Sequence, residues 1–303
     1  MRDLIIIGAG PAGLAAGIYG KRAGLDTLVL DESGIGGGQV VTTYEVDNYP
    51  GLPGISGMEL GETLKNHAIS CGVEFEETSL IAIEKKENGF LLSTSEGSME
   101  AKTVIAATGA THKNLNIPGE EELQGMGVSY CATCDGAFFR NRVTAVVGGG
   151  DVALEDALFL ARGCSKVFLI HRRDEFRGAK VLADKVKATD NIEIIYDSRV
   201  VEVSGDDMVE RINVENIKSG VIRTIDVSGL FIAVGMQPTT EVFDGFVDMK
   251  NGYIVAGEDG VTSVPGFFVA GDARTKTLRQ IITAASDGAN AATSASEYIN
   301  KLS

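Results

Sequence analysis

The chain contains one local pattern twice: a short apolar strand, a glycine-rich turn and a helix. The first copy is Leu4–Ile7, the turn Gly8-Ala9-Gly10-Pro11-Ala12-Gly13 and a helix over Leu14–Ala23. The second copy is Val143–Val147, the turn Gly148-Gly149-Gly150-Asp151-Val152-Ala153 and a helix over Leu154–Arg162. Such glycines permit a tight bend, let a pyrophosphate approach the backbone, and let the helix pack against the strand. The repeated pattern therefore predicts two dinucleotide-binding modules.

The residues after the second strand of each module indicate which nucleotide it binds. In the first module, Thr27–Leu30 leads into Asp31, about 20 positions beyond the turn, where an acid binds ribose hydroxyls. Glu32 is the competing candidate. In the second module, Lys166–Ile170 is followed by His171, Arg172, Arg173 and Arg177 in place of that acid. Guanidinium groups suit the 2′-phosphate of NADP. A solvated basic turn is the alternative.

Two cysteines separated by two residues stand in the stretch Cys131-Ala132-Thr133-Cys134-Asp135-Gly136. Such a pair closes a small redox-active ring, and one thiol of the pair usually has a lowered pKa. Asp135 is placed to carry a proton to or from a departing thiolate. The alternatives are half a zinc site or two buried thiols. Zinc would need a second pair of ligands, whereas the other cysteines and the three histidines are scattered, so we expect no metal.

The order of the segments predicts that the second module is inserted into the first. Each module continues into a meander and closes on an apolar strand ending in glycine. The meander strands are Phe90–Thr94 and Ser98–Thr103 in the first module, with closure at Val104–Gly109. In the second module, a strand over Ile192–Val203 and a meander over Met208–Val227 precede the closing apolar strand Gly229–Gly235. A further strand at 266–272 and a helix over Thr283–Ile299 are assigned back to the first module, because a chain usually completes the sheet that it began.

We therefore expect an α/β fold of two Rossmann-like three-layer domains. The first domain comprises residues 1–112 and 245–303, and the second comprises residues 113–244. Two connections, near Thr111–Gly119 and near Met236–Phe243, would form a hinge between them.

Composition narrows the classes of function. The net charge of −15 over 303 residues argues against nucleic-acid binding, and no run approaches the ~18 apolar residues of a membrane span. The chain starts with no signal-peptide pattern, and four cysteines do not make a secreted disulfide framework. We expect a cytoplasmic protein.

Two dinucleotide sites and a redox cysteine pair together imply an electron relay. A nicotinamide gives up two electrons as hydride, a disulfide takes up two electrons by thiol chemistry, and a flavin can react with both. The first module is therefore expected to hold FAD and the second NADPH.

The combined motifs resemble the bacterial-type low-molecular-weight thioredoxin reductases over essentially the full length. Besides both glycine turns and the cysteine pair, the matching motifs are Gly37-Gly38-Gln39, Glu45–Gly51, Ala107–Ala110, His171–Arg177, and Gly271-Asp272 with Arg279-Gln280. The resemblance implies thioredoxin as partner and a homodimer whose NADPH domain rotates. One orientation would set the cysteines against the flavin, and the other would expose them to thioredoxin.

The resemblance also implies the cofactor contacts. FAD would be held by Gly8, Gly10, Pro11, Ala12, Gly13, Asp31 or Glu32, Gly38, Gln39, Asn48, Gly109, Asp272 and the backbone of Arg279, Gln280 and Ile281. NADPH would be held by Gly148, Gly150, Asp151, Val152, Ala153, His171, Arg172, Arg173 and Arg177. Cys134 would lie nearest the flavin, and Cys131 would attack the thioredoxin disulfide. The alternatives are a flavin-linked reductase with another electron donor or another protein disulfide, and a non-enzymatic NADP-binding or redox-sensing protein.

Overall fold

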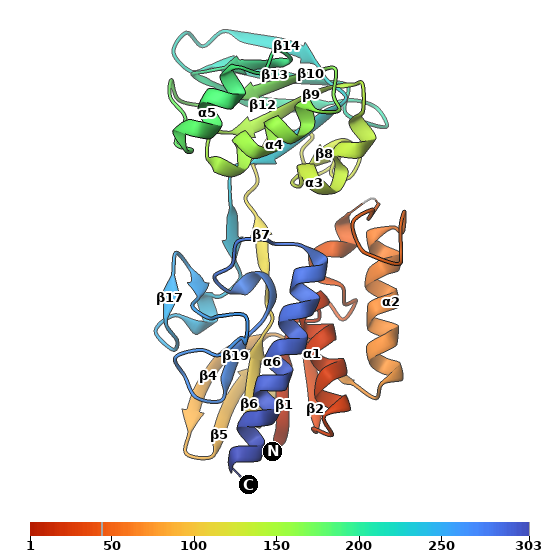
Figure 1. Cartoon of the computed structure of the whole chain (residues 1–303), viewed down its shortest axis with the longest axis vertical. Coiled ribbons are helices and arrows are strands. Elements are labelled where there is room, and N and C mark those ends of the chain that lie inside the picture. Colours follow the sequence, from red (N-terminus) through yellow and green to blue (C-terminus); the bar gives the residue numbers. More distant parts are fainter. Residues whose placement is uncertain (44, 303) are drawn as a thin grey trace.

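The computed structural model describes residues 1–43 and 45–302, which form two lobes joined by a narrow neck (Figure 1). The lower lobe, here called the core domain, contains both ends of the chain. The upper lobe, here called the middle domain, is built from the central part of the sequence. The two lobes carry separate sheets, so each buries its own apolar side chains.

The core domain is organised around β1 (Arg2–Ile7), which pairs in parallel with β2 (Thr27–Asp31) and β6 (Gly97–Ala106). The sheet order is β3-β2-β1-β6-β5-β4, with β3 (Glu74–Glu77) parallel to β2 and with β4 (Leu80–Lys86) and β5 (Gly89–Thr94) antiparallel. Where β5 ends its pairing with β6, β19 (Phe267–Val269) continues it in parallel. The C-terminal part of the chain thus completes the sheet that β1 begins.

Two helices cover one face of the core sheet. They are α1 (Pro11–Arg22) and α6 (Ile281–Leu302), and their alanines join Leu4 and Ile6 in one apolar cluster. The helices approach closely: a Cβ added to Gly288 would lie 2.0 Å from the carbonyl oxygen of Ala12. The opposite face packs against the segment that contains η3 (Glu241–Phe243), β17 (Met249–Lys250) and β18 (Tyr253–Ile254).

Further short elements surround the core domain near the neck. The helix α2 (Gly57–Ser70) is capped by Ser56, whose Oγ accepts a hydrogen bond from the Glu59 amide. It packs against the 3₁₀ turn η1 (Gly38–Thr42), and Leu60 joins Val40 in a small apolar cluster. A second 3₁₀ turn, η4 (Gly271–Ala273), follows β19 and precedes α6.

The middle domain repeats the three-layer plan. Its parallel sheet has the order β11 (Ile192–Ile195), β10 (Lys166–Ile170), β9 (Val143–Gly148), β15 (Gly229–Ala233) and β8 (Val128–Ser129). The helices α4 (Asp151–Ala161) and α5 (Lys180–Lys187) pack on one face, with α3 (Ala132–Asp135) and η2 (Gly136–Phe139) beside α4. The antiparallel meander β12 (Ser198–Ser204), β13 (Arg211–Asn216) and β14 (Ile222–Asp226) packs on the other. The predicted α/β fold of two Rossmann-like domains is confirmed.

The neck consists of two short strands that pair antiparallel, β7 (Ala110–His112) and β16 (Met236–Pro238). After β16 the chain already packs in the core domain. Phe243 is 0% exposed and contacts Phe267, with 5.3 Å between the centroids of the two tilted rings. We therefore propose that the second boundary lies at β16, slightly before the residue 244 expected from the sequence. None of the helices in residues 1–43 and 45–302 combines the length and apolar character that a membrane crossing needs.

Candidate active site

The first glycine turn is fixed by close backbone contacts. Gly8 has φ +105°, and a Cβ there would lie 2.5 Å from the carbonyl oxygen of Ala107. A Cβ on Gly13 would lie 1.8 Å from the carbonyl oxygen of Gly8. Asp31, at the end of β2, accepts a hydrogen bond from the Ala9 amide at 3.3 Å. These contacts place the N-terminus of α1 at the carboxyl end of β1. The partial positive charge of a helix N-terminus favours an anion at this position.

A cavity of about 420 Å³ opens at this turn. It is lined by nearly all of the residues that the sequence assigned to the first cofactor: Gly8, Gly10, Pro11, Ala12, Asp31, Gly38, Gln39, Asn48, Gly109, Asp272, Arg279, Gln280 and Ile281. Two assigned residues do not line it. Gly13 sits behind the turn against Gly8, and Glu32 is exposed. Of the two candidates at the end of β2, Asp31 and not Glu32 therefore faces the cavity.

The cavity has the polar character that a large cofactor would need. Among the described residues, five buried side-chain atoms have no hydrogen-bond partner, and Thr108 Oγ1, Asp272 Oδ1 and Arg279 Nε are three of them. All three residues line the cavity. A native fold rarely leaves buried polar atoms unpaired, so these atoms fit the hydroxyl, carbonyl and phosphate groups of a dinucleotide.

A buried charge network holds Asp272 in place. Asp287 on α6 accepts hydrogen bonds from Arg274 at 2.7 and 2.9 Å, from Lys276 at 2.8 Å and from the Gly271 amide at 3.1 Å. These bonds fix η4, which carries Asp272. Burial raises the pKa of the Asp272 carboxyl, and Lys276 opposes that shift.

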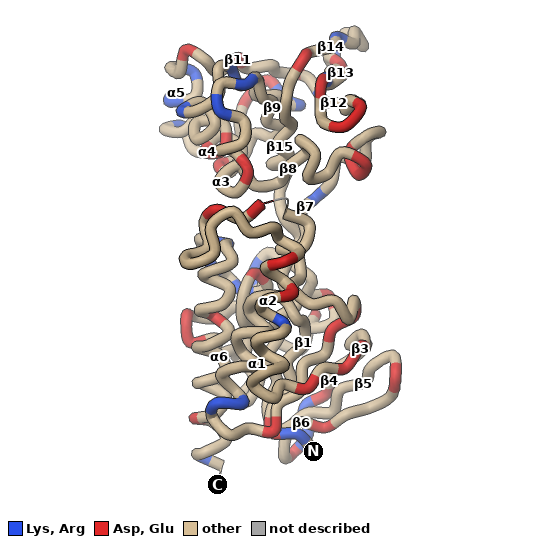
Figure 2. The backbone as a smooth tube through the Cα atoms, turned by 90° about the vertical axis from the view of Figure 1, so that its right-hand side faces the viewer, with Lys and Arg blue, Asp and Glu red and all other residues tan. Residues whose placement is uncertain are grey.

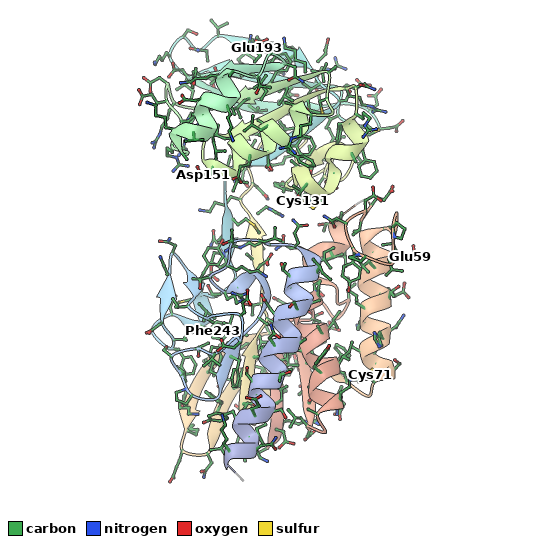
Figure 3. The ribbon with its side chains drawn as sticks, viewed as in Figure 1. Glu59, Cys71, Cys131, Asp151, Glu193 and Phe243 are labelled. Atoms are coloured by element: carbon green, nitrogen blue, oxygen red, sulfur yellow. A yellow bond between two sulfur atoms is a disulfide. The ribbon has the colours of Figure 1, made fainter. Side chains whose placement is uncertain are left out.

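The middle domain contributes the redox pair to the same cavity. Cys131 and Cys134 form a disulfide across the single turn α3, and both residues line the cavity. Figure 3 shows Cys131 on the side of the middle domain that faces the core domain. Gln280 links the two domains here, because its side chain accepts a hydrogen bond from Asn48 at 3.0 Å and donates one to Thr133 at 3.5 Å.

Asp135 lies beside the disulfide in a nonpolar setting. Its Oδ2 accepts a hydrogen bond of 2.6 Å from Ser129, and its buried Oδ1 has no hydrogen-bond partner in the described chain. Burial raises the pKa of the Asp135 carboxyl, and the bond from Ser129 partly offsets that shift. A carboxyl with a raised pKa can hold a proton closer to neutral pH, as a general acid must.

The second glycine turn has the same construction as the first. A Cβ on Gly148 would lie 2.4 Å from the carbonyl oxygen of Ala233 and 2.5 Å from the Cβ of Ala153. The buried His171 ring, 4% exposed, lies directly under Gly149 and its Nε2 contacts the Glu175 carbonyl oxygen at 3.0 Å. His171 thus supports the turn from below. Burial lowers the pKa of this imidazole.

The predicted arginine cluster lies in the loop between β10 and α5. Arg172, Arg173 and Arg177 are exposed, and within residues 1–43 and 45–302 none of their guanidinium groups forms an ion pair with an acidic side chain. The Arg177 amide donates to the Gly149 carbonyl oxygen at 2.7 Å, which ties the loop to the glycine turn. Figure 2 shows basic positions gathered at the α5 and β11 end of the middle domain. Neither this loop nor the second turn lines the disulfide cavity.

Some residues of the site carry no sequence signal. Ser129 and Thr239 line the cavity only through the fold, whereas Thr108 lies within the motif Ala107–Ala110 without having been assigned a contact. His112, on β7, stacks on Tyr130 with 4.9 Å between ring centroids, next to the disulfide. The described residues contain no group of three or more His, Cys, Asp or Glu side chains that could hold a metal ion.

A disulfide that faces a dinucleotide-type cavity in one domain, together with a second glycine turn in the other domain, defines a two-domain α/β disulfide oxidoreductase. The family model described as pyridine nucleotide-disulphide oxidoreductase matches residues 2–288, and the chain therefore belongs to that family. It is 42% identical over 303 residues to the thioredoxin reductase of Listeria innocua serovar 6a, covering 99% of this chain and 94% of that protein.

Two solved structures of thioredoxin reductases give further comparisons. The one from Streptococcus pyogenes superposes with a TM-score of 0.95 at 42% identity, covering 99% of both chains. The one from Lactococcus lactis, described as the FR conformation, has a TM-score of 0.69 at 39% identity and covers 100% of both chains. Identity and coverage are similar in the two comparisons, whereas the superposition is poorer for the second structure.

Proposed function

We propose that this chain is an NADPH-dependent thioredoxin reductase that works through FAD and the Cys131–Cys134 disulfide. The observation that carries the proposal is the position of this disulfide, which lines one cavity together with the first glycine turn. The similarity to thioredoxin reductases over nearly the whole chain supports it.

FAD fits the core domain. The N-terminus of α1 and the Gly10 backbone suit its pyrophosphate, Asp31 suits a ribose hydroxyl, and Asp272 and Arg279 offer buried unpaired atoms to its polar groups. When bound, FAD would supply the two-electron link between a nicotinamide and the disulfide. The residues of the chain would hold and orient it and exclude water.

NADPH fits the second glycine turn. The N-terminus of α4 suits the pyrophosphate, and the exposed Arg172, Arg173 and Arg177 suit the 2′-phosphate. The turn lies away from the disulfide cavity, so hydride transfer requires another arrangement of the domains. The paired strands β7 and β16 are the natural hinge, and the poorer superposition on the Lactococcus lactis structure supports such a motion.

The chain's own groups suffice for the thiol chemistry. Once the disulfide is reduced, the Cys131 thiolate attacks a disulfide of thioredoxin, and Cys134 then displaces the reduced partner. Asp135 holds the proton that the departing thiolate takes up. The assignment of Cys134 as the thiol nearest the flavin rests on the family resemblance. We also propose that the protein acts as a homodimer.

A second candidate function is a flavin-linked reductase that uses another electron donor or another protein disulfide. The unpaired arginine cluster favours NADPH as donor over this alternative. The deciding experiment is an anaerobic titration of purified, FAD-loaded protein with NADPH, followed by addition of a thioredoxin. We expect flavin bleaching by NADPH and its recovery when oxidised thioredoxin is added. Bleaching without recovery would point to another disulfide, and no bleaching would point to another donor.

A further inference from the structure

Ser129 connects the two parts of the redox centre. It is the last residue of β8, and its pairing with Phe231 on β15 fixes its backbone. Its side chain is buried at 5% exposure. Ser129 Oγ accepts a hydrogen bond from the Cys131 amide at 3.1 Å and donates to Asp135 Oδ2 at 2.6 Å. One hydroxyl therefore joins the start of the disulfide turn to the carboxyl.

The hydroxyl has one proton, and the distances show where that proton goes. The other acceptor in reach is the Cys131 carbonyl oxygen, at 3.4 Å. A contact of 2.6 Å has the length of a strong hydrogen bond between a hydroxyl and a carboxyl oxygen, whereas 3.4 Å is at the weak limit for a hydroxyl donor. The bond to Asp135 therefore takes the proton, and Oδ2 is the occupied oxygen of that carboxyl.

Occupation of Oδ2 leaves the other oxygen as the only site for a mobile proton. Asp135 Oδ1 is buried and has no hydrogen-bond partner among the described residues, and Asp135 lines the cavity with both cysteines. A protonated Oδ1 would be a donor with no acceptor in the resting protein. That is the state expected of an acid whose acceptor, a departing thiolate, appears only during the reaction.

We propose that Ser129 is a positioning residue that holds Asp135 by Oδ2 so that Oδ1 delivers the proton in disulfide exchange. The inference rests on the proposed function. In the step concerned, the electron pair of the broken S–S bond stays on the departing sulfur. The proton moves from Asp135 Oδ1 to that sulfur and leaves a carboxylate, which the Ser129 hydroxyl then stabilises.

Other titratable groups surround this corner and enter the design of the test. They are Tyr130 beside β8, His112 on β7, Asp272 and Arg279 across the cavity, and Glu155 and Asp156 on α4, which packs against α3. Cys131, just before α3, and Cys134 on α3 join them once the disulfide is reduced. Burial raises the pKa of Asp156 to about 7, so its titration could overlap that of Asp135. Asp156→Asn removes this overlap and serves as a second background.

The experiment compares Ser129→Ala, Ser129→Thr, Asp135→Asn and the double variant Ser129→Ala/Asp135→Asn. Thioredoxin reduction is measured from pH 5 to 9, in the wild-type and Asp156→Asn backgrounds. A protonated Asp135 is the active form, so activity falls as pH rises through its pKa. Loss of the hydrogen bond that stabilises the Asp135 carboxylate raises the pKa of this carboxyl. Ser129→Ala should therefore shift the decline in activity to a pH about one unit higher.

Further readouts separate positioning from simple support of the fold. At low pH, where the rate no longer depends on pH, we expect Ser129→Ala to reduce thioredoxin about ten-fold more slowly than wild type. Ser129→Thr keeps the hydroxyl, so it should have the wild-type rate and the wild-type pH profile. In the Asp135→Asn background, Ser129→Ala should cause no further loss. Infrared titration of the Asp135 carboxyl band, identified by its absence in Asp135→Asn, should give the same upward shift without turnover.

Each result decides the inference. The inference would be overturned if Ser129→Ala lowered the rate equally at every pH and changed neither the pH profile nor the pKa measured by infrared titration. Ser129 would then have a structural role only. Additive losses in the double variant would also overturn it. If Asp135→Asn itself reduced thioredoxin at the wild-type rate, the acid role in the proposed function would fail first, and the role of Ser129 would fall with it.

Discussion

At the scale of single residues, the two cysteines differ in their expected roles. If Cys134 faces the flavin, Cys131→Ser should leave a thiolate beside bound FAD and give long-wavelength charge-transfer absorbance at neutral pH. Cys134→Ser should lack the band and still form a stable mixed disulfide with thioredoxin. Absorbance spectra and nonreducing gels measure both outcomes. The opposite pattern would reverse the assignment, and wild-type rates in both variants would mean that the pair is not catalytic.

Asp156 gives a prediction about stability and pH. Burial, with Glu155 nearby, raises its pKa to about 7, above the value of about 4 expected in the unfolded chain. The contribution of this carboxyl to stability is therefore fully present below pH 4, and it is lost as pH rises from about 4 through the folded pKa of about 7. Asp156→Asn should stabilise the protein by about 1–3 kcal/mol at pH 8.5 and have little effect near pH 4. Urea unfolding at both pH values tests this. Equal effects would show that the carboxyl does not titrate as expected.

Residue-level prediction from sequence succeeded where a motif fixes backbone geometry. Gly8, Gly148 and the cysteine pair have roles that follow from local spacing. Ser129 could not be predicted, because a serine two residues before a cysteine pair has no distinguishing pattern until the structure shows its contacts with Cys131 and Asp135. Glu32 was an open alternative to Asp31, and only the position of the strand end decides which carboxylate faces the cavity.

At the scale of elements, the loop between β10 and α5 should decide nucleotide preference. Arg177→Ala should weaken NADPH use about ten-fold or more and barely change NADH use, because a charge-assisted contact to the 2′-phosphate contributes roughly 1.5–3 kcal/mol. Steady-state kinetics with both nucleotides measure this. Arg211→Ala removes the same charge on β13 and is the matched control. Equal losses with both nucleotides would assign Arg177 to the fold.

The contact between α1 and α6 gives a test of packing. Gly288→Ala would place a Cβ 2.0 Å from the carbonyl oxygen of Ala12, so the helices must separate. We expect a loss of about 1–3 kcal/mol in the free energy of unfolding and weaker retention of FAD, because α1 carries the glycine turn. Gly163→Ala is the control, since a Cβ there has nothing within 4 Å. Unfolding in denaturant measures the free energy of unfolding of both variants. Equal values for Gly288→Ala and Gly163→Ala would contradict this packing.

Element prediction failed where tertiary pairing overrode local pattern. Ser98–Thr103 and the following apolar strand were expected to be separate, but they form the single strand β6, because β1 pairs with β6 on both sides of the junction between Thr103 and Val104. Ile192–Val203 was expected to be one strand, but Asp197, with φ +50°, divides it between two sheets. The helix α5 was missed because it is only 8 residues long and follows the charged stretch His171–Arg177, which was interpreted as a cofactor-binding turn.

At the scale of the whole molecule, the sequence could indicate a hinge but not the arrangement of the domains. The contact of Thr133 with Gln280 across the neck is a long hydrogen bond of 3.5 Å between exposed side chains. The energy of such a contact is small beside those that hold each domain together, so several arrangements can have similar stability. The paired strands β7 and β16 connect the two domains among the described residues, so we expect a rotation of the middle domain to take place about these strands.

This freedom can be tested by locking the arrangement seen here. A Cβ on Gly125 of the middle domain would lie 3.7 Å from the carbonyl oxygen of Thr42 in the core domain. Thr42→Cys and Gly125→Cys, in a Cys71→Ser background, can be joined by a short bismaleimide while Cys131 and Cys134 remain oxidised. The locked protein should still pass electrons from photoreduced FAD to its disulfide, giving two new thiols on titration, because the pair already faces the cavity. Turnover with NADPH and thioredoxin should fall more than 100-fold, since the second glycine turn cannot reach the same cavity, a barrier increase of about 2.7 kcal/mol. Each single-cysteine variant treated with the reagent controls for modification and for the strain of a side chain at φ +77°. Full turnover in a completely cross-linked sample would show that catalysis needs no rotation.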